Sequence, residues 1–174
     1  MLDLGLAVTD NLNLYVMGLD MYLTKRTYVR NWDYMEESEK NYVAVKGANE
    51  GHIKSERVQY ITEQLMYWRK ANQIHQWFVD NVQDGEDDCG EYAVNLSQLK
   101  QLMDVCYEVM NDNSKANELL PVSEGFFFGS YNYDEYYFDQ VTDTYNMLIE
   151  VIEELKEHEK QINKNAWIKY RASW

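Results

Sequence analysis

Residues 17–29 read Met-Gly-Leu-Asp-Met-Tyr-Leu-Thr-Lys-Arg-Thr-Tyr-Val, and this stretch decides the fold class. Within it, Leu19, Met21 and Leu23 alternate with polar or amphipathic neighbours. Successive side chains of a strand point to opposite faces of a sheet, so a period of two predicts a strand with one buried face. We therefore predict a strand over residues 18–29.

Two later stretches have the period of helices. Apolar residues recur there every three to four positions, so that they share one side of a helix, and we predict helices over residues 95–110 and 134–161. Asn95 stands at the first boundary with Gln98 three residues later, a pairing typical of a capping box. The apolar seam of the second helix comprises Phe138, Val141, Tyr145, Leu148, Ile152 and Leu155.

The same period predicts a third helix over residues 55–82. Ser55 can cap its first amides, because a side-chain oxygen there accepts from N–H groups that have no partner inside the helix. The expected inner side of this helix consists of Val58, Ile61, Leu65, Trp68, Asn72, His75 and Val79. Two polar residues therefore interrupt an otherwise apolar side.

Shorter apolar runs predict the rest of the fold. We expect a helical turn over residues 115–120 and strands over residues 41–46, 89–94, 125–129 and 166–171. Strand 18–29 should pair with strand 41–46 as an antiparallel hairpin. The order of elements predicts an α+β fold, a small and mainly antiparallel sheet with about three main helices on one face. Residues 17–174 then form a single domain, and residues 1–16 form an N-terminal extension.

The charge of the chain excludes some classes of partner. The 174 residues carry a formal net charge of −14 at pH 7, and this acidic balance disfavours direct binding to nucleic acid or to anionic membranes. No apolar run reaches the roughly 20 residues that cross a bilayer, so we expect no membrane association. Cys89 and Cys106 lie far apart and do not resemble the disulfide framework of a small secreted protein, which favours a cytoplasmic location.

Motifs for metal, cofactor or nucleophilic chemistry are absent from the sequence. The histidines His52, His75 and His158 are scattered, and neither His-Glu-x-x-His nor Cys-x-x-Cys occurs. The acidic loop 84–88 lacks the Asp-x-Asp-x-Asp-Gly spacing of a calcium loop. The run from residue 125 to 129 holds three phenylalanines where a phosphate loop needs a polar cradle. We therefore predict no metal site, no cofactor and no catalytic residue.

One group of polar residues needs an explanation, namely Arg69, Asn72, His75 and Gln76. Asn72 and His75 fall on the apolar side of the predicted helix, where a polar group without a partner costs about 1–3 kcal/mol. Both side chains must therefore have partners. A polar network that holds the helix in place is one interpretation, and a pocket for a ligand is the alternative.

The predicted helix over residues 134–161 is acidic on its outward side. This side carries Asp139, Asp143, Glu150, Glu154 and Glu157. Carboxylates three or four residues apart are separated by about 5–6 Å along a helix, an interval comparable with that of the phosphates along a nucleic-acid strand. Such a surface can occupy the basic nucleic-acid channel of another protein, or it can simply keep the fold in solution.

Four regions of the sequence carry a resemblance to a known family. They are Met17-Gly-Leu-Asp-Met-Tyr-Leu23, Tyr67-Trp-Arg-Lys-Ala-Asn72 with Ile74-His75 and Trp77-Phe78-Val79, Gly125-Phe-Phe-Phe-Gly-Ser130 with Tyr133-Asp-Glu135, and Tyr170-Arg-Ala-Ser-Trp174. Over residues 17–174 the chain resembles an uncharacterised family of small proteins from phages, prophages and bacterial genomes. The resemblance implies a phage-related origin, and it brings no activity and no site residue with it.

The acidic surface and the phage resemblance together favour a non-enzymatic binding protein. We expect an inhibitor of a host defence enzyme that acts on nucleic acid, of the anti-CRISPR or anti-restriction type, with a basic surface on that host protein as partner and the host cytoplasm as location. The alternative is a small-ligand-binding protein or an enzyme with a pocket around Arg69, Asn72 and His75. A third interpretation is an assembly module or homo-oligomer held together by the aromatic residues Tyr131, Tyr133, Tyr136, Tyr137, Trp167 and Trp174.

Overall fold

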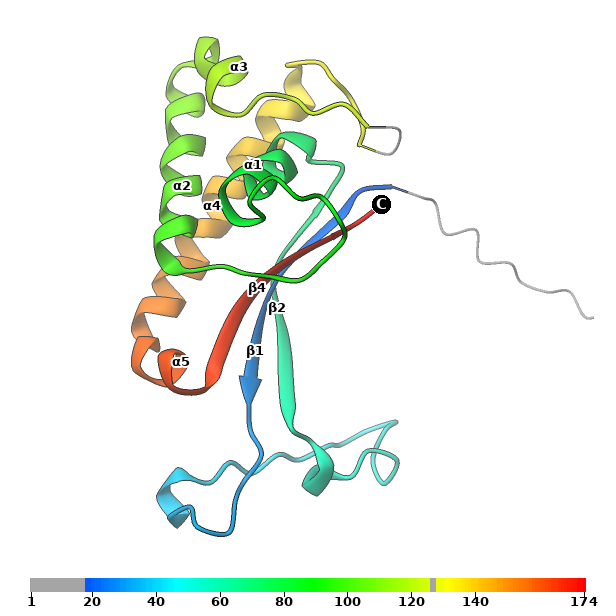
Figure 1. Ribbon diagram of the computed structural model, residues 1–174, viewed down its shortest axis with the longest axis vertical. Coiled ribbons are helices and arrows are strands. Elements are labelled where there is room, and N and C mark those ends of the chain that lie inside the picture. Colours follow the sequence, from blue (N-terminus) through cyan, green and yellow to red (C-terminus); the bar gives the residue numbers. More distant parts are fainter. Residues whose placement is uncertain (1–17, 126–127) are drawn as a thin grey trace, which may run out of the picture.

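The computed structural model describes residues 18–125 and 128–174, and within them the chain forms one four-stranded sheet and a layer of helices (Figure 1). The strands are β1 (Asp20–Tyr28), β2 (Tyr60–Arg69), β3 (Tyr92–Ala93) and β4 (Ala166–Ser173). The helices are α1 (Asn72–Val82), α2 (Leu96–Asn111), α3 (Ala116–Leu119), α4 (Glu135–Glu157) and α5 (Glu159–Asn165). The predicted N-terminal extension over residues 1–16 lies outside the described residues.

The sheet is antiparallel throughout and has the strand order β2-β1-β4-β3. Strand β1 alternates buried and partly exposed residues along its first half, so Leu23 and its inward neighbours face the helices. Helices α2 and α4 stand side by side on that side of the strands (Figure 1). This arrangement confirms the predicted α+β fold with one small antiparallel sheet.

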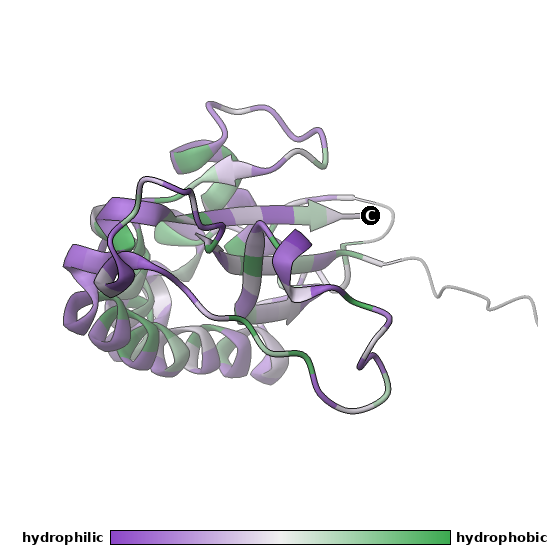
Figure 2. Ribbon diagram, turned by 90° about the horizontal axis from the view of Figure 1, so that it is seen from below, coloured by the Kyte–Doolittle hydropathy of each residue, from purple (hydrophilic) through white to green (hydrophobic). Residues whose placement is uncertain are grey.

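The core lies between the sheet and the helices. The sheet supplies buried side chains from three strands, and the helices close over them with apolar stripes that repeat every three to four residues. The helices carry both hydrophilic and hydrophobic residues along their length (Figure 2), and in α4 the buried residues recur every three to four positions along one side. The largest fully buried side chains include Leu19, Met21, Leu23, Phe78, Leu99, Leu102, Leu148 and Tyr170.

The helix predicted over residues 55–82 is wrong in its first half. Residues Ser55–Arg57 form one 3₁₀ turn, Tyr60–Arg69 form strand β2, and only Asn72–Val82 are helical. Within β2 the buried residues are Met66 and Trp68, which follow a period of two. The β-branched and aromatic residues of this segment fit a half-buried sheet better than a helix. Lys70, with a φ of 57°, then turns the chain from β2 into α1.

The predicted hairpin between strands 18–29 and 41–46 is also wrong. Residues 41–46 form no strand, because β1 pairs with β2 along one edge and with β4 along the other. No edge of β1 is left for a third partner. The described ends of the run 125–129 are not in a strand, and its residues 126–127 lie outside the described residues.

The remaining elements agree with the sequence analysis, with small changes at their ends. Helix α2 begins with the predicted capping box of Asn95 and Gln98. The predicted helix 134–161 is divided at His158 into α4 and α5. Only Tyr92–Ala93 of the predicted strand 89–94 joins the sheet, at its edge beside β4. Within the described part of the chain, the structure has no helix long and apolar enough to cross a membrane.

Candidate functional site

The first turn of α1 carries the polar residues that the sequence analysis singles out. Asn72 is 2% exposed, and its side-chain amide donates to the carbonyl oxygens of Phe128 and Ser130 at 3.1 and 2.9 Å. Its side-chain oxygen accepts from the backbone N–H of Ser123 at 3.0 Å. One amide therefore holds two separate points of the segment between α3 and α4 against the start of α1.

A glycine allows this segment to come close to the turn between β2 and α1. Gly129 has a φ of +97°, and a Cβ atom built on it would lie 3.1 Å from the Cβ of Lys70 and 3.2 Å from its carbonyl oxygen. Any larger residue would be strained at that φ and crowded by that backbone. The glycine thus places the carbonyl groups on either side of it within reach of Asn72.

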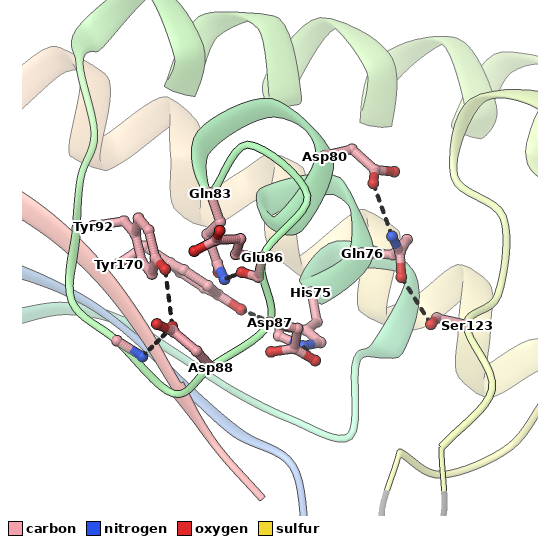
Figure 3. Close-up of polar contacts among 11 residues, drawn as sticks. His75, Gln76, Asp80, Gln83, Glu86, Asp87, Asp88, Tyr92, Ser123 and Tyr170 are labelled. Atoms are coloured by element: carbon pink, nitrogen blue, oxygen red, sulfur yellow. Dashed lines mark hydrogen bonds and ion pairs between the residues drawn. The ribbon is translucent and has the colours of Figure 1, made fainter.

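His75 lies one turn further along α1 and is fully buried. Its Nδ1 atom lies 2.7 Å from the hydroxyl of Tyr170, and its Nε2 atom lies 3.1 Å from a carboxylate oxygen of Asp87 (Figure 3). In a neutral imidazole, the nitrogen beside an ionised carboxylate carries the proton, which places the proton on Nε2 and leaves Nδ1 to accept from the Tyr170 O–H. The ring of Phe128 meets the imidazole edge to face at 5.3 Å between centroids.

The hydrogen bonds of His75 link three groups in series, the Asp87 carboxylate, the His75 imidazole and the Tyr170 hydroxyl. In hydrolases such an order activates a nucleophile, provided that the hydroxyl is accessible to a substrate. Here Tyr170 is fully buried and stacks on Phe78 with 3.8 Å between ring centroids. Burial, with a smaller contribution from the charge of Asp87, raises the pKa of Tyr170 well above its ordinary value. The hydroxyl therefore keeps its proton and holds β4 to α1.

The other two candidates have different surroundings. Gln76 accepts from the Ser123 hydroxyl at 2.8 Å and donates to Asp80 at 2.9 Å (Figure 3), so it shares Ser123 with Asn72. Arg69 lies at the end of β2, with its Nε atom 3.9 Å from Asp20 across the strand pair. The structure thus brings together Asn72, His75 and Gln76 but places the Arg69 side chain beside β1.

The polar network around α1 is complete within the described residues. Every buried side-chain nitrogen and oxygen there has a hydrogen-bond partner. A hollow beside the network, between Lys70, Gln73 and Gln140, has a volume of about 10 Å³, which is no more than one water molecule needs. Asn72 and His75 are therefore buried and hydrogen-bonded within the protein, as predicted. The hydrogen bonds described above join α1 to other segments of the fold.

Sequence reasoning missed the residues that complete this network. Asp87 belongs to an acidic loop that sequence patterns indicate as solvent-exposed, and Tyr170 belongs to the last predicted strand. One signal was available for Asp87. A buried imidazole needs an acceptor, and the acidic loop that follows α1 supplies several carboxylates within 12 residues of His75.

The acidic face of α4 consists of Asp139, Asp143, Glu150, Glu154 and Glu157, all of them exposed. The buried residues of α4 lie on the opposite side, so these five carboxylates share one face about 27 Å long. Four of them make no ion pair with the described residues, whereas Glu154 contacts the Lys25 ammonium at 2.8 Å. Burial lowers the pKa of Lys25, but its bonds to Glu154 and Glu63 outweigh this effect and raise it.

The aromatic residues proposed for an assembly patch do not form one surface. Tyr137 is buried and donates to the carbonyl oxygen of Leu120 at 2.8 Å. Trp167 lies on the side of the sheet that faces away from the helices, opposite Arg26 of β1. Trp174 packs near His75 instead, 6.3 Å away between ring centroids. The assembly interpretation therefore loses the contiguous patch on which it depended.

No group of three or more His, Cys, Asp or Glu side chains in the described part of the chain is placed to hold a metal ion. The chain matches no known protein family, no curated protein and no solved structure. Two features of the described residues remain as candidates for function, the polar network around α1 and the acidic face of α4. The network directs its amide and imidazole groups into the protein, whereas the acidic face directs a row of carboxylates to solvent.

Proposed function

We propose that the protein acts by binding and not by catalysis, and that the acidic face of α4 is the surface through which it binds. The observation that carries this proposal is the run of exposed carboxylates on one side of a single 23-residue helix. Four of these groups are not neutralised by cations of the described residues. Their combined field favours a basic partner at this face of α4 and disfavours an acidic one there.

The helix presents these charges in a fixed arrangement. Its inner side packs into the core through residues such as Leu148 and Ile152, and Asp134 caps its first turn by accepting from the backbone N–H of Tyr137 at 3.1 Å. A helix held in this way pays little conformational entropy when a partner binds. The intervals between its carboxylates resemble those between phosphates, so the face can compete with nucleic acid for a basic channel.

The resemblance to phage proteins supports a host enzyme as the partner. A phage-encoded protein with an acidic, rigid face fits the inhibition of a host defence enzyme that acts on nucleic acid, of the anti-CRISPR or anti-restriction type. The partner would then contribute a basic surface, and the complex would form in the host cytoplasm. Association should be fast at low salt, because long-range attraction steers the two surfaces together.

A titration against the basic enzyme captured by affinity pull-down from infected cells tests this proposal. The test variant carries Asp139→Asn, Asp143→Asn, Glu150→Gln and Glu157→Gln, and leaves Glu154 with its Lys25 partner. We expect slower association and weaker affinity for this variant, and weaker binding of the wild type at high salt, since the Debye length falls from about 10 Å at 0.1 M to about 3 Å at 1 M.

A matched control removes the same number of charges elsewhere. Asp33→Asn, Glu36→Gln, Glu50→Gln and Glu56→Gln change exposed carboxylates of the connection between β1 and β2. The control should bind nearly as well as the wild type. Equal losses from both variants would show that net charge alone matters and would remove the acidic face as the binding surface. Turnover of a small substrate that disappears in a folded His75→Ala variant would favour an enzyme instead.

A further inference from the structure

The face of the sheet that points away from the helices differs in chemistry from the rest of the surface. We call it the open sheet face. The strand register places Tyr67, Tyr22 and Arg171 side by side in one row across β2, β1 and β4. Gln64, Thr24 and Lys169 form the next row, and Thr62, Arg26 and Trp167 form the third. Tyr60 and Tyr28 form the last pair of the face, where β1 ends and β2 begins.

Aromatic rings therefore stand at both ends of this face, with cations between them. Tyr22 contacts Tyr67 with 5.3 Å between ring centroids, and Tyr28 contacts Tyr60 at 5.2 Å. The two pairs are six residues apart along β1, which is about 20 Å. Tyr60 also lies 6.3 Å from Trp167, and both of these rings are nearly half exposed.

A hollow opens between these aromatic residues and the cations. It has a volume of about 420 Å³ and is lined by Arg26, Tyr60, Trp167 and Lys169. Exposed ring faces stack on planar ligands, and a guanidinium and an ammonium beside them bind anions. The lining thus suits a ligand that joins flat rings to negative charges.

A carboxylate of the protein itself, that of Glu91, already forms ion pairs with Arg26 and Lys169. The Glu91 carboxylate contacts Arg26 at 3.0 Å through one oxygen and Lys169 at 2.9 Å through the other. These contacts lower the pKa of Glu91, chiefly through the Lys169 hydrogen bond. The bridge shows that the two cations can hold one anionic group between them. It also means that an external anion must displace a carboxylate.

The acidic face of α4 does not cancel this local charge at ordinary salt. Glu154 reaches the Lys25 ammonium at 2.8 Å, but it does so on the helix side of β1, opposite the side of Arg26. A helix with its side chains is about 10–12 Å across, so the carboxylates on the outer side of α4 lie beyond the Debye length of about 8 Å at 0.15 M ionic strength. The net charge of the whole chain, which disfavours nucleic acid, therefore does not describe the open sheet face.

We propose that the open sheet face binds single-stranded nucleic acid, with bases stacked on Tyr60 and Trp167 at one end and on Tyr67 at the other, and with phosphates at Arg26, Lys169 and Arg171. Two aromatic positions about 20 Å apart along β1, with cations between them, fit a strand of several nucleotides better than one free nucleotide. A duplex hides its bases and offers no ring for these side chains. This activity is separate from the proposed binding through α4, and either can fail without the other.

Fluorescence anisotropy of a labelled 12-nucleotide oligothymidylate at 50 mM salt tests the proposal. Glu91→Gln removes the competing anion and should tighten binding about threefold or more, because it frees two phosphate-binding cations. The matched control Glu150→Gln removes the same charge from the acidic face and should change affinity by less than about 1.5-fold. Trp167→Ala should weaken binding about tenfold, the usual effect of losing one stacked base.

Three results would overturn the proposal. The first is no anisotropy change with either the wild type or Glu91→Gln at low salt. The second is equal affinity of Glu91→Gln and Glu150→Gln, which would leave only the net charge at work. The third is a concentration-dependent mass in sedimentation that Trp167→Ala abolishes, since the occupant of the face would then be a second copy of the chain. A gain of affinity in a Glu91→Gln variant whose circular-dichroism spectrum matches that of the wild type supports the proposal directly.

Discussion

Two helices of this protein carry polar groups in very different ways. At the start of α1, Asn72 and His75 are buried, and each bonds to groups that are distant in the sequence. Along α4, the acidic face places carboxylates in water and leaves four of them without an ion pair among the described residues. The buried side chains contribute to stability, because removing either one would leave its hydrogen-bond partners unpaired. The exposed carboxylates of α4 contribute negative charge to which another molecule can bind.

The largest expected effect separates hydrogen-bonded tyrosines such as Tyr170 from the carboxylates of the acidic face, and it appears at alkaline pH. Burial raises the pKa of Tyr137 and Tyr170, and a hydrogen bond to Asp20 raises the pKa of Tyr67 to about 12. In each case the folded state keeps a proton that the unfolded state releases near pH 10. Their stabilising effect is therefore complete below about pH 10 and is lost as the pH rises above it, by about 1.4 kcal/mol per pH unit for each of the buried tyrosines Tyr137 and Tyr170 and by less for the partly exposed Tyr67.

Urea unfolding at pH 8, 10 and 11, with tyrosinate absorbance as a second signal, measures this effect. We expect the free energy of unfolding to fall steeply above pH 10. Tyr170→Phe should make the fall less steep, and neutralising the four unpaired carboxylates of α4 should leave it unchanged. A stability that stays constant from pH 8 to pH 11 would contradict the assignment of these hydroxyls.

A smaller effect is expected from the imidazole of the α1 network. His75→Ala leaves the hydroxyl of Tyr170 and the carboxylate of Asp87 without their partner, and we expect a loss of about 1–3 kcal/mol in the free energy of unfolding. His52→Ala is the matched control, because His52 is exposed and should cost less than about 0.5 kcal/mol. Equal denaturation midpoints for the two variants would show that the network adds nothing to stability.

The smallest effect distinguishes two carboxylates within the acidic face. Glu154→Gln breaks an ion pair with the largely buried Lys25 and should cost up to about 1 kcal/mol, because Glu154 itself is half exposed. Glu150→Gln removes the same charge from a position without an ion pair and should be neutral or slightly stabilising. Repeating both changes on a Lys25→Met background should erase the difference. A difference that persists there would have a cause other than the ion pair.

Residue patterns predicted some parts of this fold well. The alternation of Leu19, Met21 and Leu23 correctly indicated β1, and the capping box at Asn95 correctly placed the start of α2. The α4 seam was also correct, and the acidic residues opposite it are exposed as a helical period requires. In these stretches one period holds over the whole element, so local sequence and tertiary packing agree.

Patterns failed where two periods overlap. Between Ile61 and His75 the apolar residues fit a spacing of three and four, yet the chain is a strand up to Arg69 and a helix from Asn72. The change of period occurs at Lys70, whose left-handed backbone is not visible in its residue type. The partners of Asn72 were equally hidden, because they are backbone groups some 50 residues away. Such contacts depend on topology and have no local signal.

The central position of β4 has a consequence for how the protein is made. Thr24 of β1 bonds to Lys169 of β4 across 145 residues, and β4 also supplies the only pairing of β3 in the described sheet. Synthesis of the chain between β1 and β4 takes on the order of ten seconds at ribosomal rates of about 5–20 residues per second. During that time β1 and β2 can form a hairpin, but one edge and the apolar face of that hairpin remain uncovered. We expect a nascent chain in this state to expose apolar surface that chaperones can cover until β4 pairs with β1.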